Sequence, residues 1–116
     1  MRFWERPKKE FIIGLLFDEK GNEIAKMRVR FFIKNGKLEN YVAQLEYKLK
    51  GFFERWKVVV RHNCYHGFSH KDIFTASGKK RKVELGTFTD TNKAVEFAIK
   101  DISNNFESYI REYERG

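Results

Sequence analysis

The sequence predicts an α+β fold, in which a meandering antiparallel β-sheet of about five or six strands is packed by one long C-terminal α-helix. Hydrophobic residues alternate with period two over the first two thirds of the chain, which is typical of half-buried strands. In the last third they recur at spacings of three and four, which indicates an amphipathic helix. With 116 residues, of which 41% are hydrophobic, we expect a single domain over residues 1–116.

The first third of the chain contains two extended runs and two turn signals. Residues 10–18 form a short apolar run, and residues 19–22 supply a turn with a glycine available for positive φ. Residues 25–33 alternate strictly, so one face of this strand is expected in the core. Asn35-Gly36 then predicts a tight hairpin turn, because both residues tolerate left-handed backbone conformations.

The middle of the chain predicts three or more further strands. Residues 38–50 alternate; a helix is the competing interpretation, but the Tyr and Val content favours a strand. Residues 54–61 are rich in β-forming residues, and residues 68–75 form another expected strand after the histidine-containing segment. A turn at residues 76–78 leads into residues 80–85, which we expect at a sheet edge because lysines discourage further strand addition.

The last third predicts the helix and its start. Thr89, Asp90 and Thr91 are candidate N-caps, since their side-chain oxygens can accept hydrogen bonds from free backbone N–H groups. The apolar residues of this helix form a stripe along one side, and this stripe is expected to lie across the sheet. Its apolar positions are Val95, Ala98, Ile99, Ile102, Phe106, Tyr109, Ile110 and Tyr113.

The net charge of +8 is concentrated in one segment. Residues 48–82 hold ten Lys or Arg residues and two acids, whereas the other 14 basic and 14 acidic residues cancel. Such groups bind nucleic-acid phosphates without reading sequence, and an exposed aromatic such as Phe32 can stack on bases. The alternative is a solvated surface that keeps the domain soluble. The candidate nucleic-acid-binding residues are Arg61, Lys71, Lys26, Arg28, Arg30, Lys79, Lys80, Arg81 and Lys82.

Composition also restricts where the protein is expected to act. No run approaches the ~20 apolar residues of a membrane helix, so no membrane association is expected. The first residues show no secretory signal pattern, and a lone cysteine excludes an intrachain disulfide. We therefore expect a cytoplasmic protein.

The most distinctive segment holds all three histidines, His62, His66 and His70, within nine residues. On an extended strand, His70 and Asp72 share one face, and the carboxylate can orient the imidazole. Two imidazoles can act as base and acid in RNA cleavage without a metal. His66, His70 and Asp72 are therefore the candidate catalytic residues, with Arg61 and Lys71 as phosphate contacts. Solvated histidines without catalytic duty are the alternative.

A metal site and a cysteine nucleophile are two further options. His62, Cys64, His66 and His70 include zinc-ligand types, but the paired spacing of structural zinc sites is missing and the neighbourhood is cationic. No metal and no cofactor are expected. For Cys64, the role of a small buried hydrophobe is favoured over that of a nucleophile.

Residues 40–113 carry a pattern of two strands around the histidine segment, followed by a helix. In this pattern the chain resembles the TumE-like toxins of toxin–antitoxin systems and related short uncharacterised proteins of archaea and bacteria. The matching residues are Trp56, Val60, Arg61, His66, Gly67, Phe68, His70, Lys71, Asp72, Gly78, Asp101 and Tyr109.

The resemblance implies a toxin–antitoxin component that acts on RNA or translation and has a small acidic antitoxin as partner. It carries over Arg61, His66, His70 and Asp72 as site residues. Such proteins usually have Asp two residues after the arginine, where this chain has Asn63. If that acid matters to activity, Asn63 weighs against catalysis. A non-enzymatic module that binds nucleic acid or an acidic protein, and a structural homodimer, are the other hypotheses.

Overall fold

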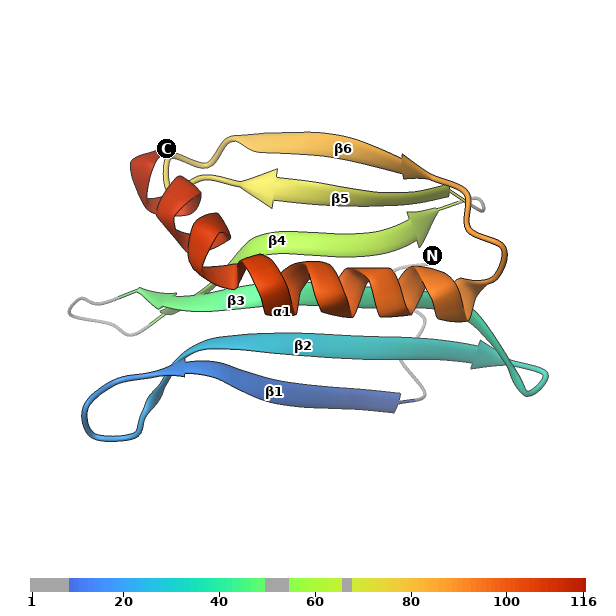
Figure 1. The fold of residues 1–116 in the computed structure, drawn as a ribbon, viewed down its shortest axis with the longest axis horizontal. Coiled ribbons are helices and arrows are strands. Elements are labelled where there is room, and N and C mark those ends of the chain that lie inside the picture. Colours follow the sequence, from blue (N-terminus) through green and yellow to red (C-terminus); the bar gives the residue numbers. More distant parts are fainter. Residues whose placement is uncertain (1–8, 50–54, 66–67) are drawn as a thin grey trace.

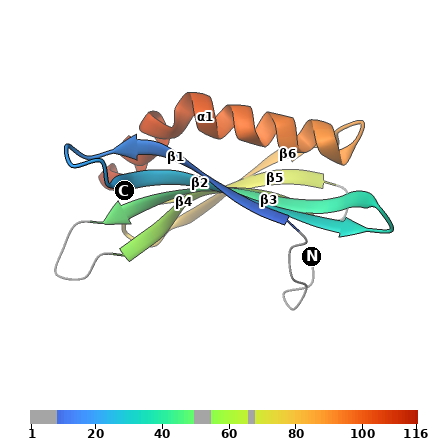
Figure 2. The ribbon, with the colours of Figure 1, turned by 90° about the horizontal axis from the view of Figure 1, so that it is seen from below.

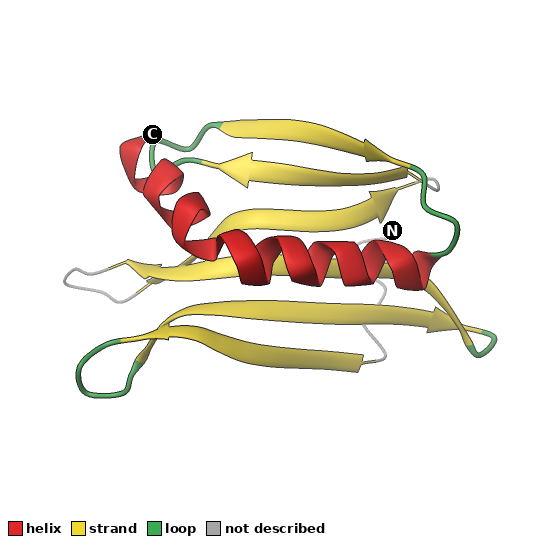
Figure 3. Cartoon of the chain, viewed as in Figure 1, coloured by secondary structure: helices red, strands yellow, loops and turns green. Residues whose placement is uncertain are grey.

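The computed structural model describes residues 9–49, 55–65 and 68–116, and it confirms the α+β fold. Six antiparallel strands form one sheet, and one helix follows them in the chain (Figures 1 and 3). The elements are β1 (Lys9–Phe17), β2 (Glu23–Lys34), β3 (Lys37–Leu49), β4 (Arg55–Tyr65), β5 (Phe68–Phe74), β6 (Lys80–Gly86) and α1 (Thr91–Arg115).

The strands follow one another across the sheet in the order β1-β2-β3-β4-β5-β6, which is the predicted meander. The predicted hairpin turn joins β2 to β3, where Asn35 and Gly36 have φ values of 53° and 73°. Both values lie in the left-handed region that tight hairpins require. As predicted, residues 80–85 lie in an edge strand, β6, and β1 forms the other edge.

The helix α1 covers one face of the sheet, and the described residues place no helix on the other face (Figure 2). Among the candidate N-caps, Asp90 is the residue used, because its carboxylate accepts a hydrogen bond of 2.9 Å from the Lys93 N–H. Figure 1 shows that α1 lies over β3 and does not reach β1, while the helix-side residues Ala25, Met27 and Val29 of β2 are buried. Within the described residues no helix is long and apolar enough to cross a membrane.

The hydrophobic core lies between α1 and the sheet. Alternation along β2 and β3 turns every second side chain toward the helix, and the helix turns its predicted stripe toward the strands. Burial of this apolar surface is the main favourable term in folding. The fully buried core side chains include Ala25, Met27, Val29, Tyr41, Ala43, Leu45, Val59, Val60, Ala98 and Ile102.

One predicted boundary is wrong. We expected the fourth strand to end near Arg61 and a loop to carry the histidine segment. Instead β4 continues to Tyr65, and His62, Asn63 and Cys64 pair with β5. The pairing supplies β-ladder partners for backbone groups that a loop would leave to solvent. The connection shrinks to residues 66–67, so the candidate His66 lies outside the described residues.

Candidate functional site

The face of the sheet away from α1, here called the polar face, carries most of the candidate residues. Side chains that lie opposite one another in an antiparallel pair point to the same face, so the register identifies its members. Across β1 to β6 these are Glu10, Ile12, Lys26, Arg28, Arg30, Gln44, Glu46, Arg61, Asn63, His70, Asp72, Lys80, Lys82 and Glu84.

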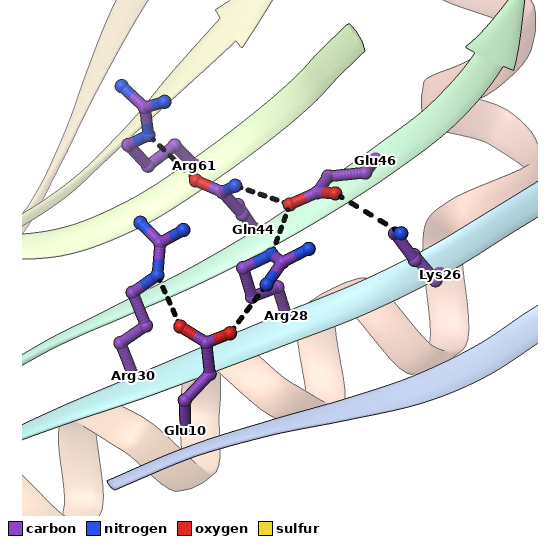
Figure 4. Close-up of polar contacts among 7 residues, drawn as sticks. All are labelled: Glu10, Lys26, Arg28, Arg30, Gln44, Glu46 and Arg61. Carbon is purple, nitrogen blue, oxygen red and sulfur yellow. Dashed lines mark hydrogen bonds and ion pairs between the residues drawn. The ribbon is translucent and has the colours of Figure 1, made fainter. Parts of the chain in front are cut away.

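A continuous set of hydrogen bonds crosses this face from β1 to β4 (Figure 4). The Glu10 carboxylate accepts hydrogen bonds from Arg28 and Arg30. The Glu46 carboxylate accepts from Arg28 Nε at 2.8 Å and from the Gln44 amide. These four strands are therefore tied together by charge-assisted bonds, which are stronger than neutral ones.

This network accounts for the cations predicted on β2. Lys26 Nζ lies 3.9 Å from a Glu46 oxygen, and Arg28 and Arg30 are bound as described above. Burial raises the pKa of Glu46, but the hydrogen bonds from Arg28 and Gln44 outweigh it, so the pKa lies below its usual value. The three cations are on the predicted face, but each is paired with Glu10 or Glu46, which offset two of the three positive charges. They are poorer phosphate contacts than expected.

Arg61 ends the network at the centre of the polar face. Its Nε donates to Gln44 Oε1 at 3.1 Å, and its guanidinium carbon lies 5.8 Å from the centre of the Phe74 ring. The register places Arg61 opposite Asp72, and Asp72 opposite Lys82 on β6. Arg61 and Asp72 were predicted to belong to one candidate site. Lys82 lies near them only because β6 pairs with β5.

His70 and Asp72 lie on the polar face, as the alternation of β5 predicted. Each side chain belongs to a residue that is only 8% exposed. Burial lowers the pKa of His70, and the positive charge of Lys82 lowers it further, although Asp72 opposes the shift. Burial and the Lys82 charge therefore favour the neutral imidazole of His70, the protonation state that a general base requires.

Lys71 was predicted as a phosphate contact, and the alternation along β5 places it on the face of the sheet opposite His70. Adjacent side chains on a strand point to opposite faces, so Lys71 lies on the helix side. There its Nζ donates to the Tyr109 hydroxyl at 2.7 Å and lies 3.5 Å from an Asp101 oxygen. The charge of Lys71 is therefore already balanced by Asp101 of α1.

Lys71 belongs to a second polar group, here called the helix-side cluster, made of His62, Lys71, Asp101 and Tyr109. One Asp101 oxygen lies 2.7 Å from His62 Nε2 and accepts from the Tyr109 hydroxyl at 2.6 Å. His62 is 0% exposed, and its Nδ1 has no hydrogen-bond partner among the described residues. The cluster links β4 and β5 to α1 inside the interface between sheet and helix.

The electrostatics of this cluster fix the charge of Asp101. Burial raises the pKa of Asp101, but hydrogen bonds from His62 and Tyr109 outweigh that effect and lower it to about 2. Burial and the hydrogen bond to Asp101 raise the pKa of Tyr109. Asp101 is thus an anion, and Tyr109 a neutral donor, throughout the physiological range.

Sequence reasoning did not assign these residues to a site. His62 ranked behind His66 and His70, and Asp101 and Tyr109 appeared only as matches to the toxin-like pattern. A signal was present, because Asp101 and Tyr109 lie eight residues apart and therefore near one face of a helix. A carboxylate beside an apolar stripe points to a buried partner, but the partner itself is not visible in the sequence.

Two other predictions concern single side chains. Phe32, expected as an exposed stacking aromatic, is only 7% exposed, so it does not offer a free ring face to bases. Cys64 is half-buried and packs against the core, which agrees with the role of a small hydrophobe. Among the described residues, no three His, Cys, Asp or Glu side chains are grouped so as to hold a metal ion.

The edge strand β6 carries the most exposed positive charge. Lys79, Lys80, Arg81 and Lys82 are all exposed, and none forms an ion pair with another part of the described chain. Lys80 and Lys82 lie on the polar face, whereas Arg81 lies on the helix side. The predicted basic surface is therefore divided between the two faces of one edge.

The fold and the two polar groups define a small basic α+β protein with a meander sheet. The chain belongs to a family described as a domain of unknown function, DUF7718, whose profile matches residues 7–116. No curated protein and no solved structure matches the chain. The family description states no activity, so the likeness to TumE-like toxins stays a prediction.

Proposed function

We propose that this protein binds single-stranded RNA on the part of the polar face formed by β4, β5 and β6. The observation that carries the proposal is the location of the charge excess. Seven of the ten Lys and Arg residues of segment 48–82 lie on these three adjacent strands, and those on β6 are exposed and form no ion pair within the described chain. A polyanion is the ligand that such a surface attracts.

A carboxylate that can accept a hydrogen bond lies among these cations, and it favours RNA over DNA as the ligand. The exposed Glu84 lies on the same face as Lys80 and Lys82, and a carboxylate repels phosphate but accepts a hydrogen bond from a ribose 2′-hydroxyl. Arg61 adds a guanidinium whose orientation is set by the hydrogen bond to Gln44. A guanidinium held in this way loses little side-chain entropy when it binds a phosphate.

Removing the charge of Lys80 and Lys82 tests the proposal. The double variant Lys80→Gln/Lys82→Gln is expected to bind a labelled single-stranded RNA more weakly, because two phosphate contacts are lost. The slope of log affinity against log salt should fall by about 1.4, or about 0.7 for each contact. Fluorescence anisotropy over a salt series measures both quantities.

The matched control is Lys20→Gln/Lys100→Gln, which removes the same charge from exposed positions away from the β4–β6 surface. We expect this control to keep the parental salt slope. Equal slopes for all three proteins would contradict the proposal. Tight binding of an acidic protein with no binding of RNA would also overturn it, and would support the alternative of a protein-binding module.

A second candidate function is metal-independent cleavage of the bound RNA, and it rests on the neutral imidazole of His70 beside Asp72. In this reaction His70 takes the proton from a 2′-hydroxyl, and the 2′-oxygen attacks phosphorus to form a 2′,3′-cyclic phosphate. The 5′-oxygen leaves and takes a proton from a second acid, for which His66 is the candidate from the sequence. Arg61 is the group available to stabilise the phosphorane charge.

His70→Ala is expected to reduce such cleavage at least ~100-fold, the lower range for the loss of a general base. The assay uses end-labelled RNA with a chelator present, and His66→Ala should show a comparable loss. RNA binding by His70→Ala should stay within a few-fold of the parent, which separates cleavage from binding. Undiminished cleavage by the His66→Ala/His70→Ala pair would remove this candidate.

A further inference from the structure

The edge strand β1 is unusually apolar for a free edge. Phe11, Ile12, Ile13 and Phe17 are between 36% and 53% exposed, and only two other large hydrophobic side chains among the described residues are as exposed. The opposite edge, β6, is guarded by lysines. An unguarded edge strand is a ready template for another strand.

The exposed residues of β1 lie on both faces of the sheet. Ile12 is opposite Arg28 and lies on the polar face, whereas Phe11 and Ile13 are opposite Val29 and Met27 and lie on the helix side. Figure 1 shows that α1 does not reach β1. A helix packed on one face would cover only one of these sets. A strand added at the edge contributes side chains to both faces and covers both.

The charges at the two ends of β1 favour an identical strand in the antiparallel direction. β1 starts at Lys9, and the turn after its end holds Asp18, Glu19 and Lys20, with Glu23 at the start of β2, so this end of the strand carries net negative charge. In an antiparallel pair of β1 strands, the basic start of each copy lies beside the acidic turn of the other. The Glu10 charge is already neutralised by Arg28 and Arg30, so pairing buries no unmatched anion.

The distribution of net charge is compatible with the same partner. Seven of the ten cations of segment 48–82 lie on β4 to β6, the half of the sheet that does not contain β1. With strands about 4.8 Å apart, the two β6 edges of a β1-linked pair lie roughly 50 Å from each other. This separation is several Debye lengths at physiological salt, so repulsion between the two basic edges is weak.

From these observations we infer that β1 is a homodimer interface, in which two copies join antiparallel β1 strands into one continuous twelve-stranded sheet. The arrangement is isologous, as expected for a twofold dimer. On the helix side, Phe11 and Ile13 of each copy face the strand of the partner. Both RNA-binding surfaces remain free at the outer edges of the joined sheet.

Ile13→Lys tests the interface, because it places a charge on the helix side of the edge where the partner strand would pack. Sedimentation equilibrium over about a hundredfold range of concentration should give a dimer for the parent. We expect the variant to dissociate at least ~10-fold more readily. The matched control is Phe68→Lys, an equally drastic change at an exposed residue of β5, and it should leave the mass unchanged.

A charge exchange checks the direction of pairing and does not depend on the folding of Ile13→Lys. Lys9→Glu and Glu19→Lys should each weaken the dimer about 2- to 5-fold, and the double variant should restore it. A parent that is monomeric at every concentration would overturn the inference, as would a dimer that Ile13→Lys leaves intact. A monomer that instead binds lipid vesicles or another protein through β1 also overturns it.

Discussion

Replacing Asp101 with alanine is expected to lower the free energy of unfolding by roughly 2–3 kcal/mol, because it leaves the fully buried His62 and the half-buried Lys71 without their polar partner. The side chain accepts hydrogen bonds from His62 and Tyr109 and lies 3.5 Å from the Lys71 ammonium. Its removal leaves His62 without a partner on either ring nitrogen and Lys71 without its countercharge. Urea unfolding followed by circular dichroism measures the loss.

The same contribution is expected to depend on pH in a defined direction. The pKa of Asp101 is about 2 in the folded protein and about 3.8 in the unfolded chain. A lowered folded-state pKa gives stability that is present above the unfolded pKa and disappears as the pH falls through the folded value. The difference between parent and Asp101→Ala should therefore narrow by about 2 kcal/mol between about pH 5 and pH 2.

Asn104→Ala supplies the control for Asp101→Ala, because Asn104 is an exposed residue of the same helix. It should change the unfolding free energy by no more than about 0.5 kcal/mol. If Asp101→Ala costs no more than this control, the helix-side cluster does not stabilise the packing of α1. A loss that stays constant between pH 5 and pH 2 would contradict the ionic basis of the effect.

Replacing the neighbouring Ile102 with alanine is expected to cost about 2–5 kcal/mol, because it opens a cavity in a close-packed core. Ile102 is 0% exposed and lies in the interface between α1 and the sheet. Unlike the loss at Asp101, this loss should not change between pH 5 and pH 2, since no titrating group is removed. The same urea experiment measures it.

Ile99→Ala is the matched control, because it makes the same chemical change in the same helix at a half-buried position. Its expected cost is about 1 kcal/mol, since neighbouring side chains and solvent can fill the space more easily. Equal costs at Ile99 and Ile102 would mean that helix propensity, and not packing against the sheet, governs both substitutions.

The regular part of this fold follows from local patterns in the sequence. The alternation of residues 25–33, the Asn35-Gly36 turn and the Asp90 cap each depend on neighbours within a few residues, and each is confirmed. The end of β4 does not follow in this way. Whether residues 62–65 are strand or loop depends on their pairing with β5, and that pairing is a property of the assembled sheet.

The polar contacts likewise divide into those that follow from local sequence patterns and those that depend on the assembled sheet and helix. That His70 and Asp72 share a face follows from period two alone, and so does the opposite orientation of Lys71. The contact between His62 and Asp101 spans 39 positions, and it depends on how α1 crosses the sheet. The salt bridge from Arg28 to Glu46 becomes predictable only once the register between β2 and β3 is known.

The order of the elements has a consequence for synthesis on the ribosome. Each strand of the meander pairs with the strand made just before it, so the sheet can assemble in step with translation. The helix is made after all six strands, and until it emerges the apolar side of β2 to β5 has no cover. Nascent chains that stall before residue 91 would expose this surface, and they are the species that chaperones should recognise.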